Sequence, residues 1–137
     1  MPIGQIKQYE KTALGTELKD YVKPQVRLQE DTVTRLLHCA LGLSGEAGEF
    51  TDSLKKHVFY GKALDRTNLI EELGDLTYYI AVAANALDSN LAEVLKVNEE
   101  KLKARYKNGF SEEAATNRNL KKERSILEKN TKKGVKK

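Results

Sequence analysis

The chain has few of the residues that cross-link, kink or anchor a protein. Its 137 residues include no tryptophan, two prolines and one cysteine, Cys39. A single cysteine excludes an internal disulfide and fits a reducing compartment. No apolar run approaches the roughly 20 residues of a membrane-spanning helix, and the first residues lack the apolar stretch of a signal peptide. We therefore expect a soluble, cytoplasmic protein with no membrane partner.

The scarcity of proline leaves the middle of the chain open to long helices. Apolar residues recur at helical spacing in four stretches, which are residues 3–14, 31–60, 65–87 and 90–107. Residues 15–31, which include Gly15 and Pro24, are expected to be irregular. No alternating β pattern competes with these assignments. The predicted fold class is all-α, with a four-helix, bundle-like arrangement.

Several of the predicted helix ends carry capping residues. Gly61 is expected to end the second helix, and Asp65 is the expected N-cap of the third. Asn90 followed by Glu93 resembles a capping box at the start of the fourth helix. The fourth helix is expected to turn three leucines inward, which are Leu91, Leu95 and Leu102.

Positive charge is concentrated at the C-terminus. The whole chain has a formal net charge of +4, from 24 Lys and Arg against 20 Asp and Glu. Residues 118–137 hold nine positive and two negative residues, a local charge of +7, so residues 1–117 carry −3. We therefore divide the chain into a domain, residues 1–117, and a basic tail, residues 118–137. Such a tail attracts nucleic acid or is a solvated extension; the second interpretation is favoured because no aromatic residue interrupts the lysines.

Two acidic pairs lie beside the apolar stripes of the second and third helices. Glu46 and Glu49 form the first pair, and Glu72 and Asp75 form the second. Residues three apart share one helix face, but such spacing is common among solvated acids. Helical phase is more informative, because both pairs flank the apolar stripe on the same side of their own helix. Each pair is therefore predicted to lie at the edge of the interface between the helices.

Acidic groups that face one another need a positive partner. Like charges brought together raise each other's pKa and oppose burial, and a divalent cation between them removes this conflict. A set of ligands made only of oxygen favours Mg²⁺ or Mn²⁺ over zinc. We expect Mg²⁺, with Mn²⁺ as the alternative, bound by the four acids.

Other polar residues share the predicted site. They are Lys56 on the second helix, Asn68 and Tyr79 on the third, and Asn98, Lys101 and Arg105 on the fourth. Acids that bind a metal, together with cations that bind phosphate, suit hydrolysis of a phosphoanhydride. The sequence shows no nucleophile triad and no glycine-rich phosphate loop.

Three motifs together resemble the MazG-like nucleoside triphosphate pyrophosphohydrolases. They are GLSGEAGE at residues 42–49, EELGD at residues 71–75, and N-x-x-K-L-x-x-R-Y at residues 98–106. The family is all-α and carries E-x-x-E and E-x-x-D, here separated by 22 residues between Glu49 and Glu72. The resemblance covers roughly residues 5–115, within the predicted domain of residues 1–117.

The resemblance implies metal-dependent cleavage of a nucleoside triphosphate between its α and β phosphates, giving a monophosphate and pyrophosphate. It assigns metal binding to Glu46, Glu49, Glu72 and Asp75, and Glu49 is our choice for the residue that accepts the proton of water. It assigns phosphate oxygens to Lys56, Lys101 and Arg105, and the sugar or base to Asn98 and Tyr79. Members of the family usually self-associate to complete their bundles, so we expect a homodimer or homotetramer.

Two alternatives remain at this stage. The first is a relative specific for one nucleotide, such as a dUTP, dCTP or phosphoribosyl-ATP pyrophosphohydrolase, because the acidic motifs are shared among these enzymes. The second is a non-catalytic helical module that binds nucleic acid through residues 118–137.

Overall fold

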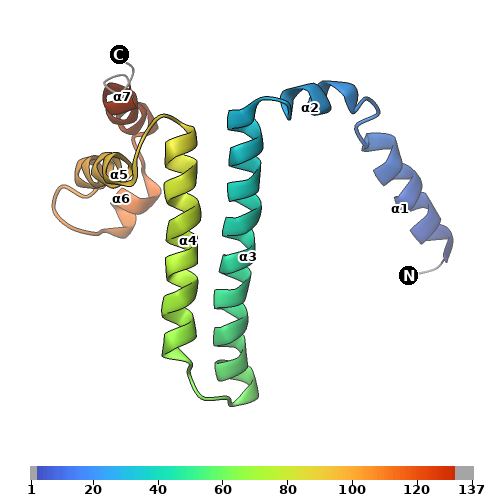
Figure 1. The fold of residues 1–137 in the computed structure, drawn as a ribbon, viewed down its shortest axis with the longest axis horizontal. Coiled ribbons are helices and arrows are strands. Elements are labelled where there is room, and N and C mark those ends of the chain that lie inside the picture. The colour runs from blue at the N-terminus through green and yellow to red at the C-terminus, as the bar shows by residue number, and fades with distance from the viewer. Residues whose placement is uncertain (1–2, 132–137) are drawn as a thin grey trace. The chain divides into compact units, whose positions relative to one another are not determined.

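Helices account for most of the residues that the structure describes. The computed structural model describes residues 3–131, with side chains to residue 129 (Figure 1). The helices are α1 (Ile3–Thr16), α2 (Val22–Arg27), α3 (Asp31–Tyr60), α4 (Arg66–Ala86), α5 (Leu91–Arg105), α6 (Glu112–Thr116) and α7 (Leu120–Thr131). Within residues 3–131 there is no strand, only an isolated bridge between Lys107 and Gly109. The predicted all-α class is confirmed. None of the helices within residues 3–131 combines the length and the hydropathy of a membrane span.

The chain divides into two compact units, the first ending at Thr34 and the second beginning at Arg35. The first unit contains α2, where the sequence predicted irregular structure. Pro24 lies in the first turn of α2, where a helix has no intrahelical partner for the missing N–H. The Asp20 carboxylate accepts a hydrogen bond from the Val22 N–H at 2.9 Å. The prediction of irregular structure was therefore wrong for α2, because Pro24 belongs to the first turn of a helix.

In the second unit α3 and α4 run antiparallel, side by side (Figure 1). Gly61 follows α3 with a φ of 66°, a left-handed conformation that glycine adopts without strain. The Asp65 side chain caps α4 and accepts from the Asn68 N–H at 3.0 Å. The Asn90 side chain caps α5 in the same way and accepts from the Glu93 N–H at 3.0 Å. These three predicted helix ends are confirmed, whereas α5 ends at Arg105, two residues before the predicted end.

The two long helices approach closely where Tyr79 of α4 lies against Gly42 of α3. A Cβ atom at residue 42 would lie 2.2 Å from the Tyr79 ring. The same ring makes edge contacts with His38 and Tyr78, with centroid separations of 5.8 Å and 5.2 Å. The Arg35 guanidinium also donates to the Asn85 side chain at 2.7 Å, which joins the first turn of this unit to the last turn of α4. Glycine at residue 42 is therefore required by the packing of α3 on α4.

The substitution Gly42→Ala is expected to displace the Tyr79 ring. Gly74→Ala is a matched control, because a Cβ at residue 74 meets nothing within 4 Å. Both substitutions gain helix propensity, but crowding of this kind costs roughly 1–3 kcal/mol. Gly42→Ala should therefore unfold at a lower temperature than Gly74→Ala. The chain has no tryptophan, so near-ultraviolet circular dichroism reports on its tyrosines and should change only for Gly42→Ala. Equal stability and an unchanged spectrum would contradict this contact.

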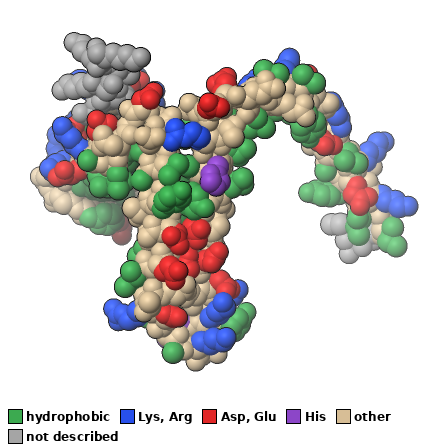
Figure 2. Space-filling model, in the orientation of Figure 1, with side chains coloured by type: hydrophobic (Ala, Val, Ile, Leu, Met, Phe, Trp, Pro, Cys, Tyr) green, Lys and Arg blue, Asp and Glu red, His purple; other side chains and the backbone are tan. Residues whose placement is uncertain are grey.

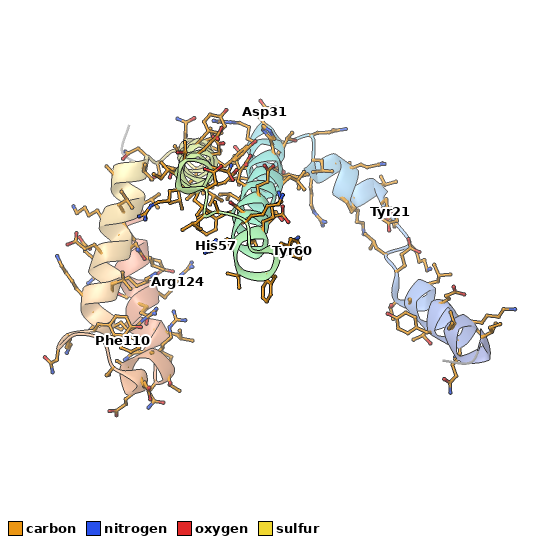
Figure 3. All side chains as sticks on the ribbon, turned by 90° about the horizontal axis from the view of Figure 1, so that it is seen from below. Tyr21, Asp31, His57, Tyr60, Phe110 and Arg124 are labelled. Atoms are coloured by element: carbon orange, nitrogen blue, oxygen red, sulfur yellow. The ribbon has the colours of Figure 1, made fainter. Side chains whose placement is uncertain are left out.

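Helices α5 and α7 pack together through a charged cluster. Glu123 of α7 is only 6% exposed, and its carboxylate accepts two hydrogen bonds from Arg105 of α5, from Nε at 2.9 Å and from Nη2 at 2.7 Å. Arg118 donates to the same carboxylate from Nη2 at 2.7 Å. Seen from below, α5, α6 and α7 form one group, with Phe110 after α5 and Arg124 on α7 (Figure 3).

This packing differs from the solvated extension favoured for the basic C-terminal residues. Residues 120–131 form α7, and the Glu123 carboxylate fixes this helix to α5. Residues 132–137 lie outside the described residues. The division into a domain, residues 1–117, and a basic tail, residues 118–137, remains a prediction.

The core of the described chain is small. Its buried apolar residues are Cys39, Ala84 and Ala86. Leu95 and Leu102 of α5 were predicted to face inward, but Leu95 is 59% exposed and Leu102 is 38% exposed. Nothing in the described chain covers Leu95, so helical spacing alone gave the wrong burial for it. Other large apolar side chains of the second unit are exposed as well, including Leu41, Val58, Phe59, Ile70, Leu73, Tyr78 and Leu87.

Candidate metal centre

Three carboxylates converge between α3 and α4. Glu46 extends from α3, and Glu72 and Asp75 extend from successive turns of α4. One oxygen of each lies within 4.8 Å of the others. Figure 2 shows acidic side chains gathered along the α3–α4 pair. Three carboxylates this close together repel one another when ionised. A divalent cation bound between them would attract all three and remove this repulsion.

Glu72 is the buried member of the cluster, with 3% of its surface exposed. Its Oε1 accepts a hydrogen bond from the side-chain amide of Asn68 at 2.7 Å. Its Oε2 is buried and has no hydrogen-bond partner among the described residues. A buried carboxylate oxygen without a donor is costly, and buried polar groups in folded proteins are nearly always paired. This oxygen therefore lacks a positively charged partner among the residues that the structure describes.

The environment of Glu46 also disfavours its negative charge. Burial raises the pKa of Glu46 above its ordinary value of 4.5. The nearby negative charges of Glu49, Asp75 and Glu72 raise that pKa further. A cation bound among these groups would reverse this effect by favouring the ionised carboxylate.

A pocket of about 440 Å³ adjoins the cluster. Its lining includes Glu49, Asp52, Ser53, Lys56, Asn68 and Glu72. The Asp52 carboxylate pairs with Lys55 and, at 2.7 Å, with Lys56. Hydrogen bonds from these two ammonium groups lower the pKa of Asp52 to about 2. The lining of this pocket thus combines acidic groups with a lysine that is paired with Asp52.

The structure brings some of the residues predicted for the site together and places others elsewhere. Glu46, Glu72 and Asp75 form the cluster, and Glu49 and Lys56 line the adjoining pocket. Tyr79 is half-buried and packs against Gly42 and His38 on the α3 side.

The predicted residues of α5 do not line this pocket. Asn98 is exposed and Lys101 is half-buried. Arg105 makes a two-hydrogen-bond ion pair with Glu123, which also contacts Arg118. Glu123 and Arg118 were assigned no role from the sequence. The signal available in the sequence was the composition of residues 118–137, which hold nine basic residues and only two acids, one of them Glu123.

The motifs of this site lie inside a recognised protein family. The family model of the MazG nucleotide pyrophosphohydrolase domain matches residues 35–110. This span is more than half of the chain and contains both acidic pairs. The chain belongs to the MazG nucleotide pyrophosphohydrolase family. The MazG family is generally metal-dependent, and the cluster of Glu46, Glu72 and Asp75 gives this member an acidic group suited to a metal ion.

One relative of the chain comes from a bacteriophage. The chain is 35% identical over 92 residues to a protein of Mycobacterium phage L5 that is named Gene 37 protein. The aligned region covers 64% of this chain and 81% of the phage protein. No solved structure matches the chain significantly. The MazG match begins at Arg35, with the second structural unit, and ends at Phe110, before α6 and α7.

Proposed function

We propose that the chain is a metal-dependent nucleoside triphosphate pyrophosphohydrolase that converts a ribo- or deoxyribonucleoside triphosphate to the monophosphate and pyrophosphate. The observation that carries this proposal is the buried, unpartnered Oε2 of Glu72 within a cluster of three carboxylates. Membership of the MazG family supports the reaction class.

The residues present fit a hard divalent cation. Glu46, Glu72 and Asp75 would hold it, and we propose Glu49, which lines the adjoining pocket but lies outside this cluster, as a fourth acidic ligand. Carboxylate oxygens are the preferred ligands of Mg²⁺, and Mn²⁺ accepts the same set. When bound, such an ion draws charge from phosphate oxygens and lowers the pKa of coordinated water.

In the proposed reaction, the oxygen of a water molecule forms a bond to the α-phosphorus. The bond between this phosphorus and the oxygen that bridges the α and β phosphates breaks. Pyrophosphate leaves with the electron pair of that bond. Glu49 accepts the proton of the water, for which a carboxylate at the pocket wall is suitably placed. Lys56 binds phosphate oxygens from the same wall and offsets the charge that builds up on them. Asp52 keeps the Lys56 ammonium at the pocket until the phosphates arrive.

The remaining substrate contacts come from other faces. We propose Tyr79 and Asn98 for the sugar or base, and Lys101 for phosphate oxygens. Arg105 was also assigned to phosphate, and it would bind one only after leaving Glu123 or by sharing its guanidinium.

We also propose that the MazG unit is completed by self-association into a homodimer or homotetramer. Only three apolar residues of the described chain are buried, whereas Leu95 and several other large apolar side chains are exposed. A second copy that covers these faces would bury apolar surface worth about 25 cal/mol per Å². Sedimentation that detects only monomer at micromolar concentration would contradict this proposal.

The direct test is release of pyrophosphate from a panel of nucleotides, which includes dUTP, dCTP and phosphoribosyl-ATP as candidates for a specific substrate. Activity is expected with Mg²⁺ or Mn²⁺ and should disappear with a chelator. Glu49→Gln should abolish most of this activity while its thermal unfolding stays like that of the parent chain. Release of orthophosphate alone, or activity that persists in the chelator, would overturn the proposed function.

A further inference from the structure

Asn68 connects the start of α4 to the buried carboxylate of the metal cluster. Its backbone N–H is bound by the Asp65 side chain at 3.0 Å, which fixes this residue in the first helical turn. Its side-chain amide is half-buried and donates to Glu72 Oε1 at 2.7 Å. Residues four apart on a helix share one face, so the contact needs no distortion of α4.

This hydrogen bond has a consequence for the geometry of Glu72. The terminal torsion of a glutamate is broad and roughly two-fold, so its two oxygens exchange places at little cost unless a contact distinguishes them. Asn68 engages Oε1, whereas Oε2 is buried and unpartnered. The amide therefore determines which oxygen of Glu72 is left for a ligand.

We propose that Asn68 is a positioning residue that holds one oxygen of Glu72 by hydrogen bonding and so presents the other to the metal ion. The inference rests on the proposed metal-dependent function, and it adds a residue outside the acidic motifs. Outer hydrogen bonds to metal-ligating side chains commonly contribute 10–100-fold to metal affinity. Asn68 itself has no need to touch the ion or the substrate.

The test is a titration of the full chain with Mn²⁺ alone. The electron paramagnetic resonance signal of the unbound ion measures how much Mn²⁺ is bound. Asn68→Leu keeps the approximate volume and the backbone N–H but removes the amide donor. Thr67→Ala is the matched control, because its exposed side chain lies in the same first turn of α4. Asn68→Leu is expected to raise the Kd for Mn²⁺ about tenfold. Thr67→Ala should leave the Kd unchanged. Without metal, Asn68→Leu should melt below Thr67→Ala because Glu72 Oε1 loses its donor, and far-ultraviolet circular dichroism should show that both variants keep their helices.

The outcomes separate this inference from the proposed function. If the parent chain binds Mn²⁺ and Asn68→Leu binds it equally well, Asn68 has no positioning role and the metal site stands. An equal loss of affinity in Thr67→Ala would assign the effect to the helix start and would also overturn the inference. If the parent chain binds no Mn²⁺, the metal-dependent function fails, and the role of Asn68 fails with it.

Discussion

Glu72→Gln is expected to lower metal-dependent pyrophosphate release at least about a hundredfold, a loss of roughly 2.7 kcal/mol of transition-state stabilisation. Glutamine keeps the length of the side chain and an oxygen that accepts from Asn68, but it removes the negative charge. The metal-free protein should be at least as stable as the parent chain. A buried carboxylate oxygen without a partner is costly, and the substitution removes the charge that needs compensation.

Glu71→Gln is the matched control for this experiment. Glu71 is the adjacent acid on α4, but it is exposed and is not among the clustered carboxylates. Its substitution should leave activity within about twofold of the parent chain, since surface charges are screened by solvent. Pyrophosphate release at the parental rate from Glu72→Gln, in a correctly folded protein, would contradict the proposed metal centre.

Glu123→Gln is expected to give the largest loss of fold stability, because it removes the negative charge that two guanidinium groups share. Arg105 is nearly buried, with 14% of its side chain exposed, and would lose the counter-charge of its two hydrogen bonds. Removal of one partner from a buried ion pair is strongly destabilising because the other charge remains desolvated. We expect a melting temperature lower by several degrees, and faster proteolysis within α7 than in α3.

The pH dependence gives a second measurement of the same contact. Hydrogen bonds from Arg105 and then Arg118 lower the pKa of Glu123 from 4.5 to about 2. A carboxyl group with a lowered pKa stabilises the fold fully above its unfolded pKa, and the contribution is lost as the pH falls through its folded pKa. The parent chain should therefore lose more stability between pH 4.5 and pH 2 than Glu123→Gln does.

Glu128→Gln provides the comparison within α7. Glu128 pairs with Arg124 one turn away, and both side chains are largely exposed. Exposed pairs of this spacing contribute about 0.3–0.5 kcal/mol. The stability of this variant should stay within about 0.5 kcal/mol of the parent chain at every pH. A loss as large as that of Glu123→Gln would contradict the special role of Glu123.

The long helices could be predicted from the sequence because their signals are local. The ends at Gly61, Asp65 and Asn90 depend on backbone conformation and on caps within three residues, and the structure confirms all three. Short helices carry weaker signals. Pro24 was taken for a break, although its place in the first turn of α2 is one that helices accept.

The candidate site was predictable where neighbours on one helix define it. Helical phase placed the acids on adjoining faces, and the structure brings Glu46, Glu72 and Asp75 together. Contacts between distant residues were beyond reach, because spacing does not reveal which cation meets which acid. The pairing of Arg105 with Glu123, 18 residues away, is of this kind. The exposure of Leu95 could not be predicted either, because helical spacing does not indicate whether another surface covers an apolar face.

The position of Glu123 matters for how the boundaries of this domain are drawn. The MazG match ends at Phe110, yet the carboxylate that neutralises Arg105 of that matched segment comes from α7. A truncated chain that stopped at the family boundary would keep the whole acidic cluster and lose this counter-ion. The Arg105 guanidinium would then remain largely buried without its counter-ion, which is destabilising. The shortest segment that carries the motifs is therefore not the shortest segment that folds well.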